Sequence, residues 1–205
     1  MFLSRRRDVV YPQAEHQRLS GVIAAAWAEP PPLPFALLVR GVATHDRGYG
    51  ELDTDEIGGV SDERWLEIQR RGVAAQDDPV VDLLVAMHVA RLASYGDDAA
   101  ARRELEAVRD ERLAAAGVET AVATAADRIT ELCDRVTFAF CFEQAGSGEV
   151  GSIAYVLDAD GAGTLDPWPL RGPELRETAT GFEAGGYPER LVPVERELRL
   201  SPAAL

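Results

Sequence analysis

The pattern of apolar residues changes at Gln144, and this change limits the fold more than any other feature of the 205-residue chain. Before it, apolar side chains recur at helical spacing; after it, short apolar runs alternate with glycine and proline, which is typical of β-hairpins. We therefore predict a mainly α-helical bundle over residues 1–144 and a small β-rich extension over residues 145–205 that packs on the same body. A domain of this length buries roughly 70% of its unfolded surface.

Six segments before Gln144 have the features of helices. The run Glu29-Pro30-Pro31-Pro32 stops the first of them, and Arg47-Gly48-Tyr49-Gly50 ends the second. Ser61 and Asp78 are expected to cap the third and fourth, with proline directly after Asp78. The predicted helices are residues 12–28, 34–46, 61–76, 78–95, 97–116 and 118–142.

Charge and composition narrow the classes of partner. The formal charge is −14 and the chain has no lysine, which disfavours a basic face for nucleic acid or for an anionic membrane. The basic start of the chain precedes no apolar signal segment, and no run is long enough for a membrane span. Cys133 and Cys141 are spaced as free buried thiols. We expect a soluble cytoplasmic protein with a small-molecule substrate and no nucleic-acid or membrane partner. A homodimer is compatible with these features.

The histidines indicate a metal site. His16, His45 and His88 are the only ones, and each falls on a different predicted helix, so packing of the helices can bring them together. Asp134 lies in the most apolar part of the last helix, where a carboxylate needs a cation, an arginine or hydrogen bonds. The alternative is a helical core in which the carboxylates pair with arginine and the histidines are ordinary packed residues.

An ordered set of motifs extends over most of the chain. A helix with a histidine, a central helix ending in His-Asp, and later helices with a histidine and an aspartate resemble the HD-domain superfamily of metal-dependent hydrolases. The whole set looks like an uncharacterised bacterial family, the domain of unknown function 3891. The motifs are Gln-x-x-His-x-x-Leu-Ser-Gly from Gln13, His45-Asp46-Arg47-Gly48-Tyr49, Asp78-Pro79 with Leu83 to His88, Asp134 before an apolar run, and Pro167-Trp168-Pro169.

The resemblance implies an HD-domain-like helical bundle in which His16, His45, Asp46 and Asp134 bind one divalent metal. Imidazole and carboxylate ligands together suit Mn, Fe, Zn, Ni or Co. His88 would lie nearby as general acid or base, as a substrate contact or as ligand to a second metal, and a packed core histidine is the alternative.

The chain departs from the HD pattern after the His-Asp pair. Arg47-Gly48-Tyr49 stands where many HD domains have a small or apolar residue, glycine and lysine. The missing lysine weakens the case for phosphate substrates, although Arg47 could contact a phosphate through two nitrogens.

Several further residues are candidates for the site. Asp53, in an acidic loop, could position water or substrate, or be solvated. Gln13 could orient a ligand or contact substrate, or belong to the helix start. Arg47, Arg71 and Arg91 are the arginines expected near the pocket, with surface ion pairs as the alternative. Aromatic candidates for the pocket mouth, which could equally be core residues, are Trp65, Tyr155 and Trp168.

The function predicted from these residues is a metal-dependent hydrolase, in which a metal-bound water of lowered pKa attacks a phosphoester or similar polar bond. His88 and Asp53 are its expected catalytic residues. One alternative is a module that binds a small ligand or metal without turnover. Another is a structural protein that keeps a vestigial site.

Overall fold

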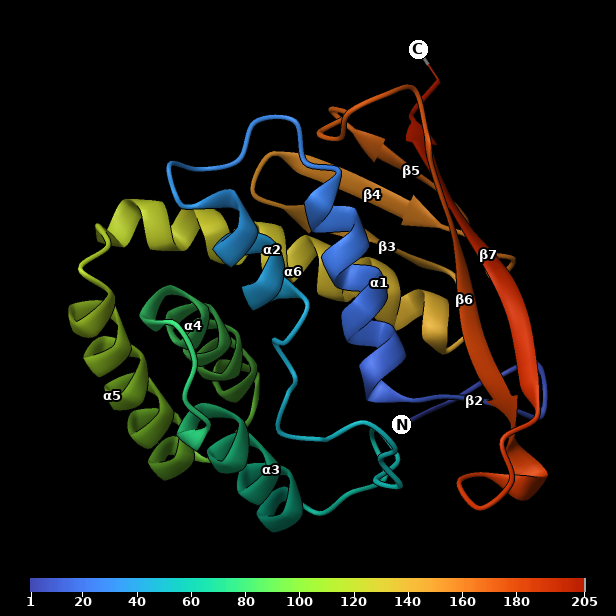
Figure 1. Cartoon of the computed structure of the whole chain (residues 1–205), viewed down its shortest axis with the longest axis horizontal. Coiled ribbons are helices and arrows are strands. Elements are labelled where there is room, and N and C mark those ends of the chain that lie inside the picture. Colours follow the sequence, from blue (N-terminus) through green and yellow to red (C-terminus); the bar gives the residue numbers. More distant parts are fainter. Residues whose placement is uncertain (205) are drawn as a thin grey trace.

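Both ends of the chain contribute strands to one seven-stranded sheet in the computed structural model, which describes residues 1–204 (Figure 1). The strand order is β1-β2-β6-β7-β5-β4-β3, and neighbours are antiparallel except β5 and β7. The strands are β1 (Phe2–Leu3), β2 (Val9–Tyr11), β3 (Gly146–Val150), β4 (Ile153–Leu157), β5 (Ala162–Asp166), β6 (Leu175–Glu183) and β7 (Pro193–Pro202).

The prediction of a mainly α-helical, HD-domain-like bundle with a small strand extension is wrong. The protein is 46% helix and 20% strand, and its mixed sheet curls into a half-barrel. An all-α description is wrong for the same reason. β1 and β2 have two and three residues, too few to show strand alternation in the sequence, and β2 is held by pairing Val9 with Glu183 and Val10 with Phe182. Segments on both sides of Gln144 therefore share the sheet, while the proposed division into domains stays a prediction.

The six predicted helices are present. Ser61 and Asp78 cap the third and fourth as expected, accepting hydrogen bonds from the backbone of Arg64 and Val80. The second helix ends earlier than predicted, so His45 and Asp46 lie in the turn that follows it. The helices are α1 (Gln13–Ala25), α2 (Phe35–Val42), α3 (Asp62–Ala74), α4 (Pro79–Tyr95), α5 (Ala99–Ala116) and α6 (Thr120–Cys141), and a 3-10 turn, η1 (Ala184–Gly186), follows β6.

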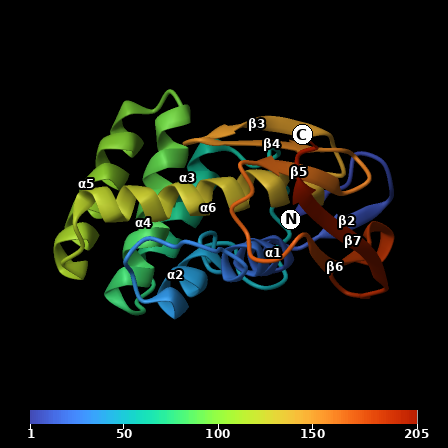
Figure 2. The same ribbon diagram turned by 90° about the horizontal axis from the view of Figure 1, so that it is seen from above.

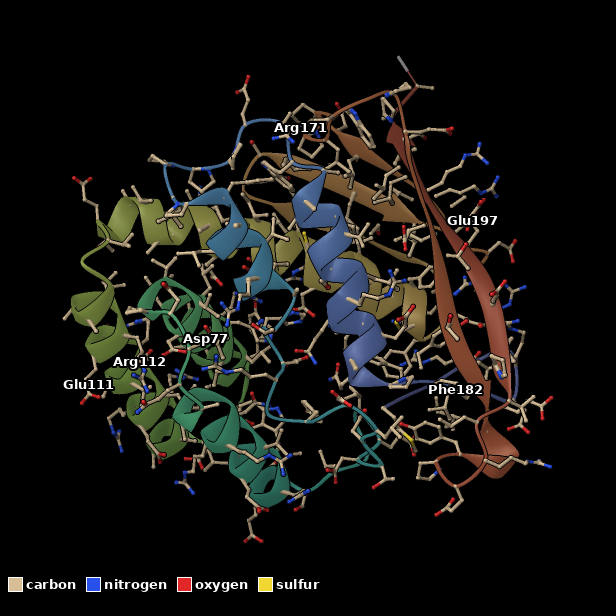
Figure 3. All side chains as sticks on the ribbon, viewed as in Figure 1. Asp77, Glu111, Arg112, Arg171, Phe182 and Glu197 are labelled. Carbon is tan, nitrogen blue, oxygen red and sulfur yellow. The ribbon has the colours of Figure 1, made fainter. Side chains whose placement is uncertain are left out.

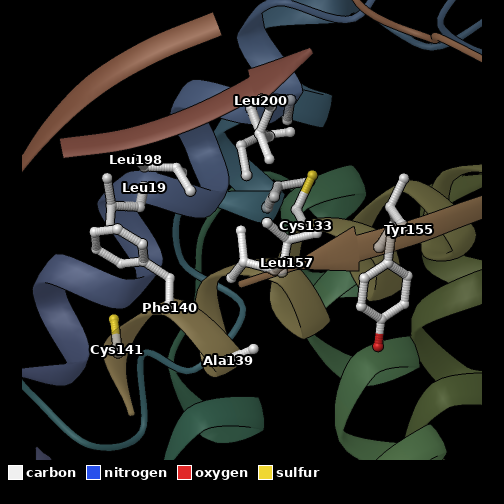
Figure 4. Packing of buried hydrophobic residues seen from close by; sticks show 14 of the residues in the cluster. Leu19, Cys133, Ala139, Phe140, Cys141, Tyr155, Leu157, Leu198 and Leu200 are labelled. Carbon is white, nitrogen blue, oxygen red and sulfur yellow. The ribbon is translucent and has the colours of Figure 1, made fainter. Parts of the chain in front are cut away.

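The long helix α6 joins the helical part of the molecule to the sheet. It runs from beside α5 to β3 and β4 and also packs against α1, α2 and α4 (Figure 2). Its buried residues meet α1 and the inner face of the sheet in one core, in which Phe140 and Cys133 lie near Leu19, Leu157 and Leu198 (Figure 4). Both cysteines are free and buried, as predicted.

The outer face of β7 is polar. Along β7, Leu198 and Leu200 are buried while Glu197 and Arg199 are exposed, the alternation of a strand with one face on a core. Glu197 projects outward from β7 (Figure 3). Within residues 1–204 we find no helix with the length and apolar character needed to cross a bilayer.

Two glycines let α2 pack closely between α1 and α4. A Cβ on Gly21 would lie 2.6 Å from that of Ala43, and a Cβ on Gly41 would collide with the side chain of Leu84. Because only glycine allows these approaches, the turn after α2 lies directly against α1 and α4. This packing places His45 beside α1 and α4, the helices that contain His16 and His88.

Candidate metal centre

The histidines and two of the aspartates of the sequence motifs meet in one buried cluster. His16 comes from α1, His45 and Asp46 from the turn after α2, His88 from α4 and Asp134 from α6. None of the five exposes more than 8% of its surface. The structure thus brings together five polar side chains that the sequence spreads over more than a hundred residues.

His16, His45 and Asp134 present one atom each to a common centre, and Asp46 lies beside the two histidines, where it also groups with His45 and His88. Nε2 of His16 lies 3.0 Å from Nε2 of His45 and 3.3 Å from Oδ1 of Asp134. Oδ2 of Asp46 lies 3.9 Å and 3.7 Å from the two Nε2 atoms, and Nε2 of His45 lies 3.8 Å from Asp134. Ligands about 2.1 Å from a metal ion are roughly 3.0–3.4 Å apart. The spacing fits a single divalent cation after small side-chain shifts.

Hydrogen bonds on the far side of each ring aim the lone pairs of His16 and His45 at this centre. Nδ1 of His45 donates to the Val42 carbonyl at 2.7 Å. The Thr137 hydroxyl donates to the Cys133 carbonyl at 2.9 Å and so accepts from Nδ1 of His16 at 3.0 Å. With Nδ1 protonated, each neutral ring has a bare Nε2, and two such atoms 3.0 Å apart repel unless a cation or proton lies between them.

The charges of the cluster favour a cation at the same place. Burial lowers the pKa of His16. Burial also opposes protonation of His45, but the carboxylates of Asp46 and Asp134 outweigh it and raise the pKa of His45. Burial alone would raise the pKa of Asp46, but the nearby His45 and His88 side chains lower it to about 2. Two ionised carboxylates thus face the histidine pair, which is the donor set of a metal site.

His88 lies beside the four and is fixed by Arg91. Nη2 of Arg91 lies 3.0 Å from Nδ1 of His88, and Nε2 of His88 lies 3.2 Å from Oδ1 of Asp46. Arg91 also contacts Asp127 at 3.2 Å and Asp134 at 3.8 Å. Of the three arginines predicted near the pocket, Arg91 is the one in contact with the cluster.

Gln13 lies at the edge of the cluster. Its Nε2 donates to Oδ2 of Asp46 at 3.2 Å, while its Oε1 is buried without a hydrogen-bond partner in residues 1–204. A buried amide oxygen without a donor costs stability, so a water or ligand that donates to it would be bound favourably. The amide is therefore placed to contact a molecule at the centre.

Asp53 supports Gln13 and does not line the pocket. Its Oδ1 accepts from the backbone nitrogen of Gln13 at 2.8 Å, and its Oδ2 contacts the amino group of Met1. α1 has Pro12 at its N-cap and no side-chain cap of its own, so Asp53 supplies the acceptor from a distant loop. Its catalytic role stays a prediction, and its contacts are those of a helix cap.

Arg47 and Arg71 lie away from the cluster. Arg47 donates to the carbonyls of Gly72 and Ala75 and to Asp82, and Arg71 donates to the carbonyl of Gly48. These bonds tie the turn after α2 to α3 and α4. Arg112, labelled in Figure 3, reaches the same region from α5. Substrate binding by Arg47 or Arg71 stays a prediction.

The cluster forms one end of a pocket of about 440 Å³. Asp46, His88 and Asp134 line it together with Gln13 and Arg91. Its other walls are mostly apolar or aromatic and include Tyr49, Trp65, Tyr95, Phe138 and Tyr155. Trp168 lies outside it.

The comparison with protein families agrees with the ordered motifs. A family model described as a protein of unknown function, DUF3891, matches residues 4–180. The chain belongs to this family. No curated protein and no solved structure matches the chain. Membership in DUF3891 thus identifies relatives without assigning an activity.

Two features of this DUF3891 site were not predicted from its sequence. Thr137 and Ser20 form a buried hydroxyl pair, 2.8 Å apart, behind His16. Thr137 lies three residues after Asp134 on α6, so helical spacing alone could have placed it on the same face. Tyr49 belongs to the motif that contains the His-Asp pair, but its place in the pocket depends on the turn after α2.

Proposed function

We propose that the protein is a metal-dependent hydrolase with one divalent ion held by His16, His45, Asp46 and Asp134. The observation that carries the proposal is the pair of Nε2 atoms 3.0 Å apart, flanked by two carboxylates that line a pocket. The fold and the family match give no support to the HD-domain resemblance, so the proposal rests on the geometry of the site alone. The donor set fits Mn, Fe, Zn, Ni or Co.

A divalent ion at this site would supply a water molecule of lowered pKa and would polarise the substrate bond. The protein's own residues then have distinct tasks. The unpartnered Oε1 of Gln13 would accept a hydrogen from a water molecule bound there and so would orient it. His88 holds Oδ1 of Asp46, which leaves Oδ2 facing the histidine pair. We propose His88 as a positioning residue; proton transfer by His88 stays a prediction.

Elemental analysis of the purified protein tests the metal. After dialysis against a weak chelator, the wild type should retain about one transition-metal ion per chain, and the His45→Ala, Asp46→Ala double variant should retain none. Asp110→Ala, which removes an exposed carboxylate on α5, is the matched control and should keep the metal. Equal retention, or equal absence after several divalent ions are offered, would refute the metal centre.

A turnover screen tests hydrolysis separately. The loaded protein is offered phosphomonoesters, carboxylic esters and amides, and any hydrolysis should disappear in the double variant. If metal is retained but none of these bonds is cleaved, the non-catalytic binding module becomes the better description of the site.

A further inference from the structure

The pocket outside the metal ligands is built for an apolar group. Trp65 comes from α3, Tyr95 from α4, Phe138 from α6 and Tyr155 from β4, and all four line the same space. Tyr95 and Phe138 remain 61% and 37% exposed in a chain whose other large apolar side chains mostly lie in the core. Aromatic walls stabilise flat apolar molecules by stacking and edge contacts. The volume of about 440 Å³ is that of a small-ligand site.

The cationic side chains of the pocket are already engaged. Among the described residues that line it, Arg91 and Arg135 are the two arginines. Arg91 is paired with Asp127 and contacts Asp134, while Arg135 is paired with Glu131 at 2.7 Å and donates to the hydroxyl of Tyr95. The charge of a divalent ion would be offset by its two carboxylate ligands. A chain of several phosphates would therefore find no free guanidinium along this pocket.

Tyr49 supplies a free polar contact at the inner end. Its ring is buried, with 8% exposed, and lines the pocket beside Asp46. Its hydroxyl makes no hydrogen bond to any described residue, and burial raises its pKa, so the phenol remains a proton donor. A hydroxyl that lines the pocket without a protein partner is available to donate to an oxygen acceptor on a bound molecule.

From these three observations we propose that the substrate is a small molecule with an aromatic or similarly flat apolar body and a single polar group to be cleaved. The polar group lies at the metal ligands and accepts from Tyr49, and the apolar body lies between Trp65, Tyr95 and Phe138. The engaged arginines disfavour polyphosphates and nucleic acids as substrates. The inference rests on the proposed function, because it places the scissile bond at the metal centre.

Calorimetric binding of three probes to the metal-loaded protein tests the ligand class without turnover. Phenylphosphonate carries both the oxyanion and the ring, methylphosphonate lacks the ring, and imidodiphosphate replaces it with a second anionic group. We expect phenylphosphonate to bind at least roughly tenfold more tightly than either of the others. Comparable or tighter binding of methylphosphonate or imidodiphosphate would overturn the inference.

Substitutions test the contributions of the two ends of the pocket to binding separately. Trp65→Ala should remove most of the preference for phenylphosphonate over methylphosphonate, whereas Tyr49→Phe should weaken both probes by the same factor, roughly tenfold. Tyr95→Ala repeats the first test with a mostly exposed side chain whose loss leaves the core intact. The control is Trp168→Ala, which removes a tryptophan outside the pocket. An unchanged preference in both Trp65→Ala and Tyr95→Ala would contradict the assignment.

The two proposals fail in different ways. Selective binding of phenylphosphonate without cleavage of any ester or amide would leave the ligand class standing and remove the hydrolase. Cleavage of pyrophosphate, with no preference among the probes, would keep the hydrolase and overturn the ligand class.

Discussion

The guanidinium of Arg91 donates a hydrogen bond to Nδ1 of His88 over 3.0 Å, and this contact fixes which ring nitrogen carries the proton. Arginine has no acceptor, so Nδ1 must accept. A neutral His88 then has its hydrogen on Nε2, which lies 3.2 Å from Oδ1 of Asp46 and donates to it. The chain Arg91–His88–Asp46 thus orients a proposed metal ligand through two hydrogen bonds.

The tautomer of His88 can be measured directly. In the metal-loaded protein, long-range proton–nitrogen NMR spectra should show a bare Nδ1 and a protonated Nε2 for His88. Arg91→Met removes the donor, so the ring should then populate the other tautomer or a mixture. Arg103→Met, an exposed arginine on α5, should leave the His88 signals unchanged. A wild-type ring with its proton on Nδ1 would contradict the assignment.

Short sequence patterns predict the helices. The sheet depends on pairing between residues far apart in the chain, which such patterns do not show. Caps, prolines and apolar spacing place six helices from the sequence alone. The two N-terminal strands have no such signal, because β2 becomes a strand by pairing with β6, far along the chain, and β1 by pairing with β2. The end of α2 was also misplaced: the helix was expected to reach Asp46, but it ends at Val42 and the residues after it form turns.

For the candidate site, the residue types in the sequence predicted which side chains would cluster, but the sequence did not show how those side chains are oriented. Buried histidines and aspartates are costly without partners, so their presence in apolar helices indicated a cluster. Arginines are common on surfaces and in ion pairs, and the sequence could not show that Arg91 contacts His88 while Arg47 and Arg71 bind backbone carbonyls. The free Oε1 of Gln13 is visible only in three dimensions.

The hydroxyl of Thr137 should tune metal affinity although it is not a ligand. It accepts from Nδ1 of His16 and holds that ring with Nε2 toward the centre. Thr137→Val keeps the shape and removes the acceptor, so metal affinity measured by competition with a chelator should fall roughly tenfold to a hundredfold. Thr130→Val is the control, since Thr130 is also buried on α6 but bonds only the Ala126 carbonyl. Equal losses in the two variants would assign Thr137 to packing alone.

Glu143 should make stability depend on pH below the neutral range. It is buried after the end of α6, where Arg7 binds both of its oxygens and Tyr11 donates at 3.1 Å. Burial opposes ionisation, but Arg7 foremost, together with Ser4 and Arg196, lowers the pKa of Glu143 from its ordinary 4.5. The stabilisation is therefore complete above pH 4.5 and is lost as the pH falls through the lower, folded-state pKa.

Urea unfolding of Glu143→Gln checks this dependence. At pH 7 the variant should be less stable than the wild type by about 2 kcal/mol, because charge-assisted hydrogen bonds are lost. The difference should shrink as the pH is lowered below 4.5, where the wild-type carboxyl also takes up its proton. Glu149→Gln, an exposed carboxylate on β3, should change the unfolding free energy by less than about 0.5 kcal/mol at either pH. A constant difference for Glu143→Gln across this range would mean that its effect is steric.

Gly21 should couple helix packing to the metal centre. A Cβ at this position would lie 2.6 Å from Cβ of Ala43, well inside van der Waals contact, so Gly21→Ala must push α1 away from the end of α2. His16 lies on α1 and His45 directly after α2, and their Nε2 atoms are 3.0 Å apart. We expect a loss of about 1–3 kcal/mol in unfolding free energy and a several-fold loss of metal affinity.

The double variant Gly21→Ala, Ala43→Gly tests whether this coupling is steric, because it removes the Cβ that the new methyl group would meet. It should recover metal affinity more completely than stability, since the histidines regain their spacing while a glycine at the end of α2 still costs backbone entropy. Gly185→Ala in η1, where the nearest atom to a new Cβ is 4.0 Å away, controls for the substitution itself. If the double variant binds metal no better than Gly21→Ala, the spacing of α1 and α2 does not set the geometry of the site.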